Sequence, residues 1–350
     1  DELLDDRVLY ADAEWPVFDR ELRAQLAVFA DDPERQMNVL REAHQAQVFR
    51  LLAKDLDGRL TVERLADELS ALADLVLAIT LDLVWSQLRG RHRERPRFAV
   101  VAYGKLGGKE LGYASDLDII FLYDDPDEAA PEIYARFAQR LNTWLTSRTS
   151  SGALFDTDLR LRPSGASGLL VSSIAAFREY QEQQAWSWEH QALTRARCCA
   201  GDPAVGAQFE AIREEVLRRR REPAVLAHEV QAMREKMRAA HPNASGLFDV
   251  KHDRGGMIDI EFAVQFLVLA HAHRHPRLTG NLGNIALLRI AAELGLVPAA
   301  LADPAREAYR EFRRIQHALR LNGAPYARVP AEGVAAHAAA VLALWNGVFG

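Results

Sequence analysis

The amino-acid sequence predicts an α+β fold that is mostly α-helical, with one small mixed sheet between two helical regions. Three observations support this prediction. Apolar side chains recur at helical spacing in residues 1–95, short β-rich apolar runs separated by turns begin at residue 98, and helical spacing returns after Ser173. We therefore place domain boundaries at 1–95, 96–200 and 201–350, a division that suits a chain of 350 residues.

The first region reads as three helices. Their apolar positions are Phe18, Leu22, Leu26 and Phe29, then Met37, Leu40 and Leu51, then Leu65, Leu69, Leu72, Val76, Ile79 and Leu83. The second helix is expected to end near Asp57–Gly58, and Thr61 is the expected N-cap of the third. The basic segment 89–97 that follows is interpreted as a solvated linker.

The sheet is predicted from short segments between residues 98 and 173. FAVVAY (98–103) and LDIIFLY (117–123) are predicted strands, and a helix is expected to open at Pro131. Within residues 153–163, charged side chains alternate strictly with uncharged, mostly apolar ones, which predicts a further strand. A loop and another strand follow up to Ser173, and the rest of the chain is predicted to be helical, with breaks at Gly295 and near Pro304.

Charge and cysteine usage narrow the class of protein. The net charge is −6, whereas a chain that wraps nucleic acid is usually basic, so we expect no nucleic-acid partner. Cys198 and Cys199 are the only cysteines and are neighbours, which rules out a disulfide framework and favours a reducing, cytoplasmic location. No apolar run approaches the roughly 18 residues of a membrane span, so no membrane partner is expected. Because the first residue is Asp1 and not Met, we expect a fragment of a longer protein.

Two carboxylates stand one residue apart at the start of the second predicted strand. Asp116 and Asp118 would face the same way and repel each other. A divalent cation removes that conflict, and carboxylate oxygens suit Mg²⁺. Asp158 or Asp156, on the strand predicted at 153–163, supplies a third acid. Two Mg²⁺ ions held about 3.5–4 Å apart clamp the attacking and leaving oxygens of phosphoryl or nucleotidyl transfer.

A glycine-rich turn precedes this acid pair. Its glycines let backbone amides approach phosphate oxygens closely, and a lysine adds positive charge. Neither the Walker spacing nor GxGxxG is present, which excludes ordinary P-loop ATPases and Rossmann enzymes. Arg160 is a candidate for neutralising triphosphate charge, with an ion pair to a strand acid as the alternative. The candidate nucleotide- and phosphate-binding residues are Gly104, Lys105, Gly107, Gly108, Ser115 and Arg160.

A strand, a glycine turn, Asp-x-Asp on the next strand and a later Asp resemble the nucleotidyltransferase superfamily, whose small sheet is the palm of polymerase β and its relatives. Four blocks narrow the resemblance to the bifunctional glutamine synthetase adenylyltransferase family. They are YGKLGGKELGYASDLDIIFLY (103–123), DTDLRLRPSG (156–165), WEHQALTRARCCAGD (188–202) and FDVKHDRGGMIDIEFAVQFLVL (248–269). GYASDLD and KHDRGGMIDIEF are similar to the C-terminal, adenylylating half, so the deadenylylating half would lie outside this chain.

The resemblance implies transfer of AMP from ATP to a tyrosine hydroxyl of glutamine synthetase, with release of pyrophosphate. It also implies a PII signal protein as regulator and glutamine as a candidate effector. Asp116 and Asp118 would hold two Mg²⁺ ions, and Asp158, which directly precedes LRLRP as in the family, would ligate the catalytic ion and orient or deprotonate the tyrosine. Many small members carry serine where this chain has Lys105, so a charged contact, or a register shifted through Gly107–Gly108, replaces the hydroxyl contact.

Other readings stay open at this level. The rivals are the deadenylylating, phosphorolytic half, a uridylyltransferase of a PII signal protein, and a non-catalytic regulatory module. Two interpretations, substrate contact and structural packing, stay open for each of four further charged residues: Arg195, Arg197, Asp259 and Glu261.

Overall fold

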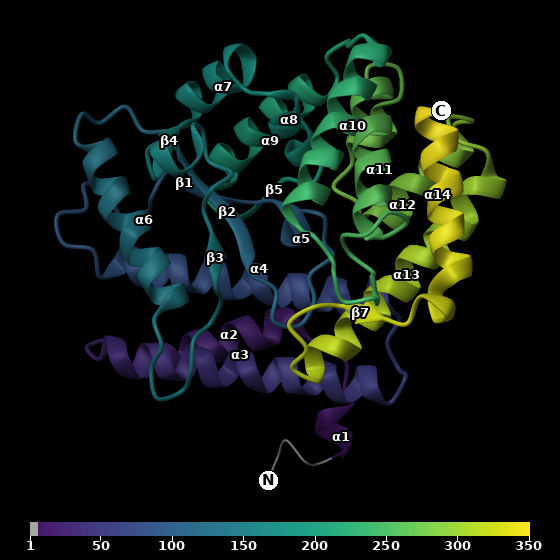
Figure 1. Cartoon of the computed structure of the whole chain (residues 1–350). Coiled ribbons are helices and arrows are strands. Elements are labelled where there is room, and N and C mark those ends of the chain that lie inside the picture. Colours follow the sequence, from purple (N-terminus) through teal and green to yellow (C-terminus); the bar gives the residue numbers. More distant parts are fainter. Residues whose placement is uncertain (1–5) are drawn as a thin grey trace. The chain divides into compact units, whose positions relative to one another are not determined.

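Helices make up most of the structure, and one five-stranded mixed sheet is built from segments between residues 98 and 201 (Figure 1). The computed structural model describes residues 6–350. By their contacts the residues divide into unit 1, Asp1–Tyr180 with Arg197–Glu210, and unit 2, Gln181–Ala196 with Ala211–Gly350. The predicted fold class, α+β and mostly helical, is confirmed. The division into three domains stays a prediction.

Unit 1 begins with helices whose ends follow from local capping. They are α1 (Asp6–Leu9), α2 (Trp15–Val28), α3 (Pro33–Leu56) and α4 (Val62–Ser86). The Asp32 side chain accepts a hydrogen bond from the Arg35 amide at 3.0 Å, and the Thr61 hydroxyl accepts one from the Arg64 amide at 3.2 Å. The predicted cap at Thr61 is therefore confirmed, and Gly58, with φ +70°, supplies the turn between α3 and α4.

The sheet brings together segments that are far apart in the sequence. Its strands are β1 (Phe98–Ala102), β2 (Leu117–Tyr123), β3 (Thr157–Asp158), β4 (Val171–Ser173) and β5 (Arg197–Gly201). β2 runs antiparallel to β1 and parallel to β3 and β4, and β5 pairs antiparallel with the other edge of β1. The short helix α5 (Gly104–Gly107) links β1 to β2, and α6 (Ala130–Thr146) follows β2.

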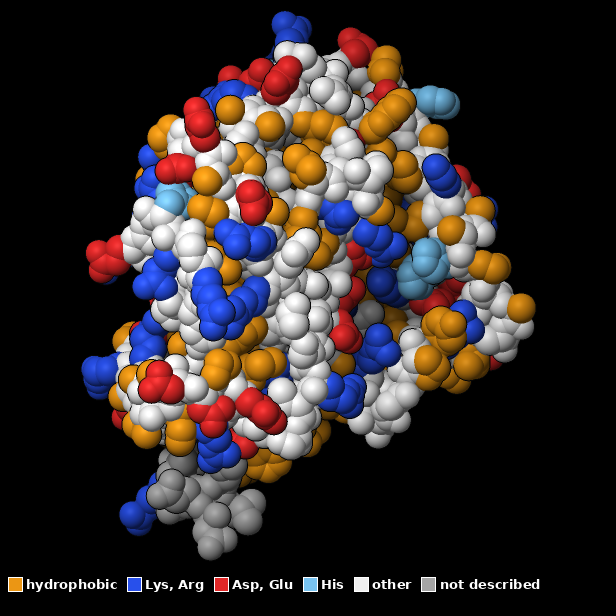
Figure 2. Space-filling model, turned by 90° about the vertical axis from the view of Figure 1, so that its left-hand side faces the viewer, with side chains coloured by type: hydrophobic (Ala, Val, Ile, Leu, Met, Phe, Trp, Pro, Cys, Tyr) orange, Lys and Arg blue, Asp and Glu red, His pale blue; other side chains and the backbone are white. Residues whose placement is uncertain are grey.

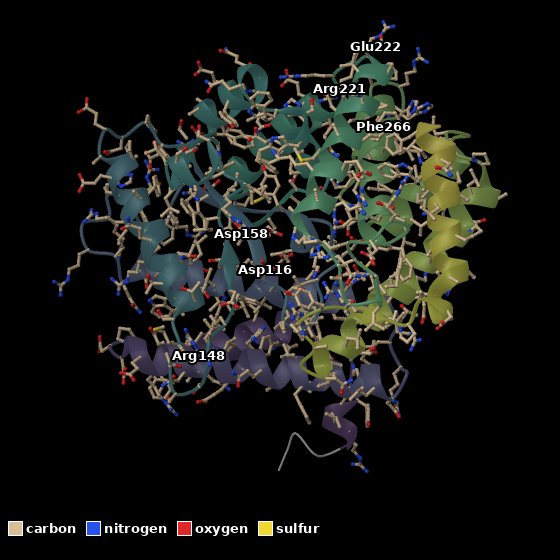
Figure 3. All side chains as sticks on the ribbon, in the orientation of Figure 1. Asp116, Arg148, Asp158, Arg221, Glu222 and Phe266 are labelled. Carbon is tan, nitrogen blue, oxygen red and sulfur yellow. The ribbon has the colours of Figure 1, made fainter. Side chains whose placement is uncertain are left out.

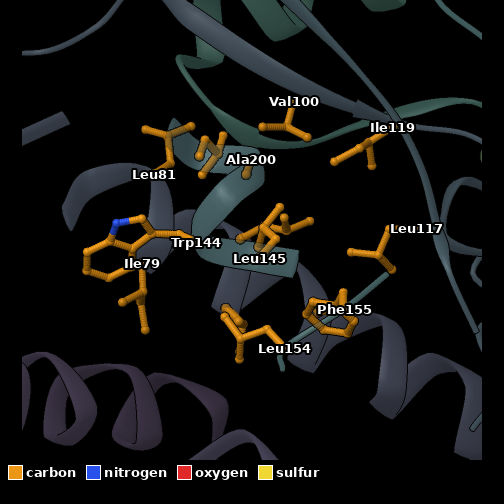
Figure 4. Packing of buried hydrophobic residues seen from close by; sticks show 14 of the residues in the cluster. Ile79, Leu81, Val100, Leu117, Ile119, Trp144, Leu145, Leu154, Phe155 and Ala200 are labelled. Carbon is orange, nitrogen blue, oxygen red and sulfur yellow. The ribbon is translucent and has the colours of Figure 1, made fainter. Parts of the chain in front are cut away.

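One face of the sheet packs on helices and forms the core of unit 1. Every second residue of β2, Leu117, Ile119 and Phe121, is buried in one cluster with side chains of α4 and α6, such as Ile79 and Leu145 (Figure 4). Because side chains alternate along a strand, the even-numbered residues of β2 point to the opposite face. This alternation determines where the acidic residues point.

The structure corrects three of the sequence predictions. Of residues 153–163 only β3 is a strand, because the Arg160 amide donates to the Asp158 side chain at 2.9 Å and turns the chain. Residues 197–201, predicted to be helical, form β5, because they pair with the free edge of β1. Pro304 lies inside a helix and does not break it.

Unit 2 is a set of helices with one small ribbon. Two helices, α7 (Ile174–Gln183) and α9 (Pro203–Leu217), cross the unit boundaries. The others are α8 (Ser187–Leu193), α10 (Pro223–Ala240), α11 (Met257–His271), α12 (Asn284–Glu293), α13 (Ala299–Leu321) and α14 (Ala335–Phe349). The ribbon pairs β6 (Phe248–Asp249) with β7 (Arg328–Val329), and the turn after β6 carries the Gly255–Gly256 pair.

Among residues 6–350, two helical segments are long and apolar enough to cross a membrane, by length and composition only. They are Val62–Ser86, with 61% of its most apolar window buried inside the protein, and Ala331–Phe349, with 17%. The first is a core helix of unit 1, and two such segments are weak evidence for a membrane span. On the face in Figure 2, Lys and Arg side chains are interspersed with Asp and Glu side chains.

Candidate active site

Three carboxylates converge on the sheet face that lies opposite the α4–α6 core. Asp116, Asp118 and Asp158 each present a carboxylate oxygen, and these oxygens all lie within 4.8 Å of one another. Asp116 is exposed and the other two are partly buried, so solvent reaches the group. Figure 3 shows Asp116 and Asp158 lying close together beside β2 and β3.

The sheet ladder explains this convergence. Asp118 and Asp158 are directly paired in the parallel register of β2 and β3, so their side chains leave the sheet on the same side. Asp116 directly precedes β2 and lies two residues before Asp118, so its side chain leaves the chain on the same side as that of Asp118. Asp156 does not belong to the group: its side chain is exposed, and its backbone carbonyl accepts the Leu117 amide at 2.9 Å.

Gly104 allows the chain to pass directly beside this acid group. Its φ is +56°, and a Cβ placed there would lie 2.2 Å from Oδ2 of Asp118. The next residue back, Tyr103, donates its amide to the Asp118 carbonyl at 2.7 Å. A side chain at position 104 would therefore both strain the backbone and displace the Asp118 carboxylate.

The other glycines of the turn are engaged with their own backbone. The Gly107 amide donates to the Tyr103 carbonyl at 2.9 Å, and the Gly108 amide donates to the Gly104 carbonyl at 3.1 Å. These two amides close the turn, so their expected contact with phosphate stays a prediction. Lys105 lies on the acid side, where its ammonium donates to the Ser115 hydroxyl at 3.4 Å, directly before Asp116.

Arg160 binds the third acid. Its Nε lies 3.0 and 2.9 Å from the two carboxylate oxygens of Asp158, and Nη2 also donates to Oδ2. These hydrogen bonds hold the pKa of Asp158 below its usual value. The Arg160 side chain itself is 78% exposed. Arg162 instead donates to the carbonyls of Leu159, Ala166 and Gly168 and shapes the loop.

Asp259 and Glu261 of the KHDRGGMIDIEF block have partners within unit 2. Asp259 is 4% exposed, forms an ion pair with Arg234 and accepts the Gly255 amide at 2.7 Å. Glu261 lies 3.2 Å from Arg195 and accepts from the Tyr309 hydroxyl at 3.0 Å. These contacts hold the Gly-Gly turn and α11 to neighbouring elements of unit 2.

Arg197 has a partner that the sequence did not indicate. Its guanidinium contacts both carboxylate oxygens of Asp74 in α4, at 2.7 and 2.8 Å. Asp74 was missed because it lies 123 residues away on a helix whose pattern reads only as core. No local signal in the sequence joins the two.

A small mixed sheet that carries three aspartates beside a glycine turn defines the class of the nucleotidyltransferases. Comparison with known proteins makes the assignment specific. Residues 1–212 match the model of the glutamate-ammonia ligase adenylyltransferase family, and residues 226–341 match a second model, described as GlnD PII-uridylyltransferase. The chain belongs to the glutamate-ammonia ligase adenylyltransferase family.

Relatives from several bacteria match over the whole chain. A protein of Aromatoleum aromaticum is 61% identical over 350 residues, and one of Burkholderia pseudomallei is 58% identical over 356 residues. One of Nitrosomonas eutropha is 53% identical over 368 residues. All three are named bifunctional glutamine synthetase adenylyltransferase/adenylyl-removing enzyme. Each match covers 100% of this chain but only 37%, 38% and 40% of the respective relative, so the chain spans well under half of their length.

Proposed function

We propose that this chain transfers AMP from ATP to a tyrosine hydroxyl of glutamine synthetase and releases pyrophosphate. The observation that carries the proposal is the convergence of Asp116, Asp118 and Asp158 beside the Gly104 turn. The names of the relatives support glutamine synthetase as the protein substrate. The adenylylating direction rests on the likeness of GYASDLD and KHDRGGMIDIEF to that half of the family.

The donor set of the acid group suits magnesium. Every ligand atom that it offers is a carboxylate oxygen, and these oxygens lie near enough to share a cation. Asp116 and Asp118 would hold two Mg²⁺ ions, with Asp158 ligating one of them. When bound, Mg²⁺ neutralises charge on the polyphosphate and lowers the pKa of the tyrosine hydroxyl, which is near 10 in water.

The remaining chemistry falls to the side chains around the acids. In the transfer, the tyrosine oxygen forms a bond to the α-phosphorus, the bond to the pyrophosphate oxygen breaks, and the hydroxyl proton is lost. We assign to Asp158, from the family resemblance, the role of orienting the hydroxyl and accepting this proton. Lys105 supplies positive charge for the phosphates and the leaving pyrophosphate, and the exposed guanidinium of Arg160 does so by exchanging its ion pair with Asp158 for a phosphate.

We further propose a cytoplasmic protein, regulated by a PII signal protein and with glutamine as a candidate effector, with no nucleic-acid or membrane partner. The match of residues 226–341 to a PII-uridylyltransferase model supports a link to PII. That match also keeps uridylylation of PII as a second candidate. The matched segment contains none of the three converging aspartates, so adenylylation is the favoured function.

The test is to incubate the chain with purified, unmodified glutamine synthetase, ATP and Mg²⁺, and to measure the mass of the intact synthetase and of its proteolytic peptides. One added AMP on a single tyrosine peptide is expected. A parallel reaction supplies modified synthetase and phosphate, and another supplies PII with UTP. Dominant release of ADP in the first parallel reaction, or modified PII in the second, would move the assignment to a rival.

A further inference from the structure

A buried network lies on the sheet face that points away from the acids. Arg197 is 6% exposed, and its guanidinium bridges two elements. Nη1 and Nη2 donate to the Asp74 carboxylate, at 2.7 and 2.8 Å. Nε and Nη2 also donate to the carbonyl of Leu106, at 3.3 and 3.2 Å. The side chain therefore ties helix α4 to the α5 turn.

The register of the sheet puts Arg197 out of direct reach of the reacting groups. Arg197 pairs with Ala102 of β1, which belongs to the helix-facing core together with Val100. Paired residues leave a sheet on the same side, so Arg197 points toward α4, whereas Asp118 points to the opposite face. The hydrogen bonds to the Leu106 carbonyl connect Arg197 to the glycine turn beside the acids.

The turn held by this carbonyl needs external support. Gly104 and Lys109 bracket it, and both adopt left-handed backbone conformations, with φ +56° and +53°. At a non-glycine residue such as Lys109 this conformation persists only where surrounding contacts hold it, whereas Gly104 adopts it without steric cost. The helix between them has four residues, too few to be stable alone.

We propose that Arg197 and Asp74 form a positioning pair that fixes the Gly104–Lys109 turn for the polyphosphate of the bound nucleotide. The inference rests on the proposed nucleotidyltransferase function. A guanidinium suits this role because its planar fork donates from three separate nitrogens to a carboxylate and a carbonyl at once, whereas the three donors of an ammonium all sit on one nitrogen. Loss of the pair should loosen nucleotide binding more than turnover, because Asp118 stays in the β-ladder.

The test uses Arg197→Lys and Asp74→Asn in the full chain, with Arg41→Lys as the matched control. Arg41 is also fully buried and donates to backbone carbonyls, at 2.8 Å to both Gly152 and Trp144, but it does not contact the turn. The Arg41→Lys variant therefore shows how far the loss of a buried arginine that holds two backbone segments together changes the stability and nucleotide binding of unit 1. Thermal unfolding of all variants is measured in parallel.

Three measurements separate positioning from general stability. Calorimetry with a non-hydrolysable ATP analogue and Mg²⁺ should show about tenfold weaker binding in both turn variants and unchanged binding in Arg41→Lys. Amide exchange at Gly107, Gly108 and Glu110 should accelerate in the turn variants alone. Steady-state kinetics should show the KM for ATP raised about tenfold, with kcat within about threefold. The double variant Arg197→Lys with Asp74→Asn should weaken analogue binding no more than either single substitution does, because the two residues act as one pair.

The outcomes also separate this inference from the proposed function. A parent chain that binds the analogue but does not modify glutamine synthetase sinks the proposed function, while binding and exchange still decide the role of Arg197. If Arg197→Lys does not fold, Asp74→Asn decides, because the Asp74 side chain is 28% exposed and its loss is milder. The inference is overturned if a folded turn variant binds the analogue within twofold of the parent. It is also overturned if Arg41→Lys weakens analogue binding as much as the turn variants do. A parent chain that does not bind the ATP analogue at all also overturns the inference.

Discussion

Replacement of Gly104 by alanine should abolish most of the transfer while leaving the chain folded. The new Cβ would lie 2.2 Å from Oδ2 of Asp118, where ordinary contact begins at 3.4 Å, so that oxygen must withdraw by about 1.2 Å. A misplacement of about 1 Å in a catalytic group costs about 100-fold in rate. The left-handed φ of +56° adds roughly 1–2 kcal/mol of strain, which corresponds to a fall in Tm of about 1–3 °C for a chain of 350 residues.

Gly58→Ala separates these two effects. Gly58 has a similar φ of +70°, but a Cβ there meets nothing within 4 Å. This control should lose comparable stability and keep its activity. Both variants are assayed by mass spectrometry for AMP on glutamine synthetase and by calorimetric unfolding. If Gly104→Ala transfers AMP as well as Gly58→Ala does, the close approach to Asp118 is not required for the reaction, and the reasoning is refuted.

Three further outcomes are expected. Asp118→Asn should remove AMP transfer at saturating Mg²⁺. Without metal its Tm should match or exceed that of the parent, because the substitution relieves repulsion within the acid group. Transfer activity within a few-fold of the parent would contradict the metal assignment. Asp158→Asn should lower kcat far more than ATP affinity, whereas Asp156→Asn should be mild because its side chain is exposed and its backbone carbonyl is retained; the reverse ranking would show that the third acid is misassigned. Burial lowers the pKa of His44 to about 4 from 6.5, so its neutral form is favoured by folding, and stability is lost as pH falls from about 6.5 toward 4. His44→Phe should flatten this part of the urea-unfolding profile by about 1–3 kcal/mol, and an unchanged slope would exclude His44 as its source.

The sequence alone determined the features that depend on neighbouring residues. Alternation and apolar runs located β1 and β2, the Thr61 hydroxyl marked the start of α4, and the two-residue spacing placed Asp116 and Asp118 on one face. Each of these follows from a strand or helix period, or from a cap that acts within three residues. The family resemblance likewise rested on contiguous blocks.

Tertiary structure decided the features that depend on pairing across the chain. The register of β2 with β3 brought Asp158, and not Asp156, to the acid group. The same strand was expected to run to residue 163, but a side-chain hydrogen bond ended it and turned Arg160 back onto Asp158. Residues 197–201 became a strand because β1 offered an edge, and only then did Arg197 meet Asp74, 123 residues away. Such partners leave no trace in a local pattern, because their contact exists only once the sheet has formed.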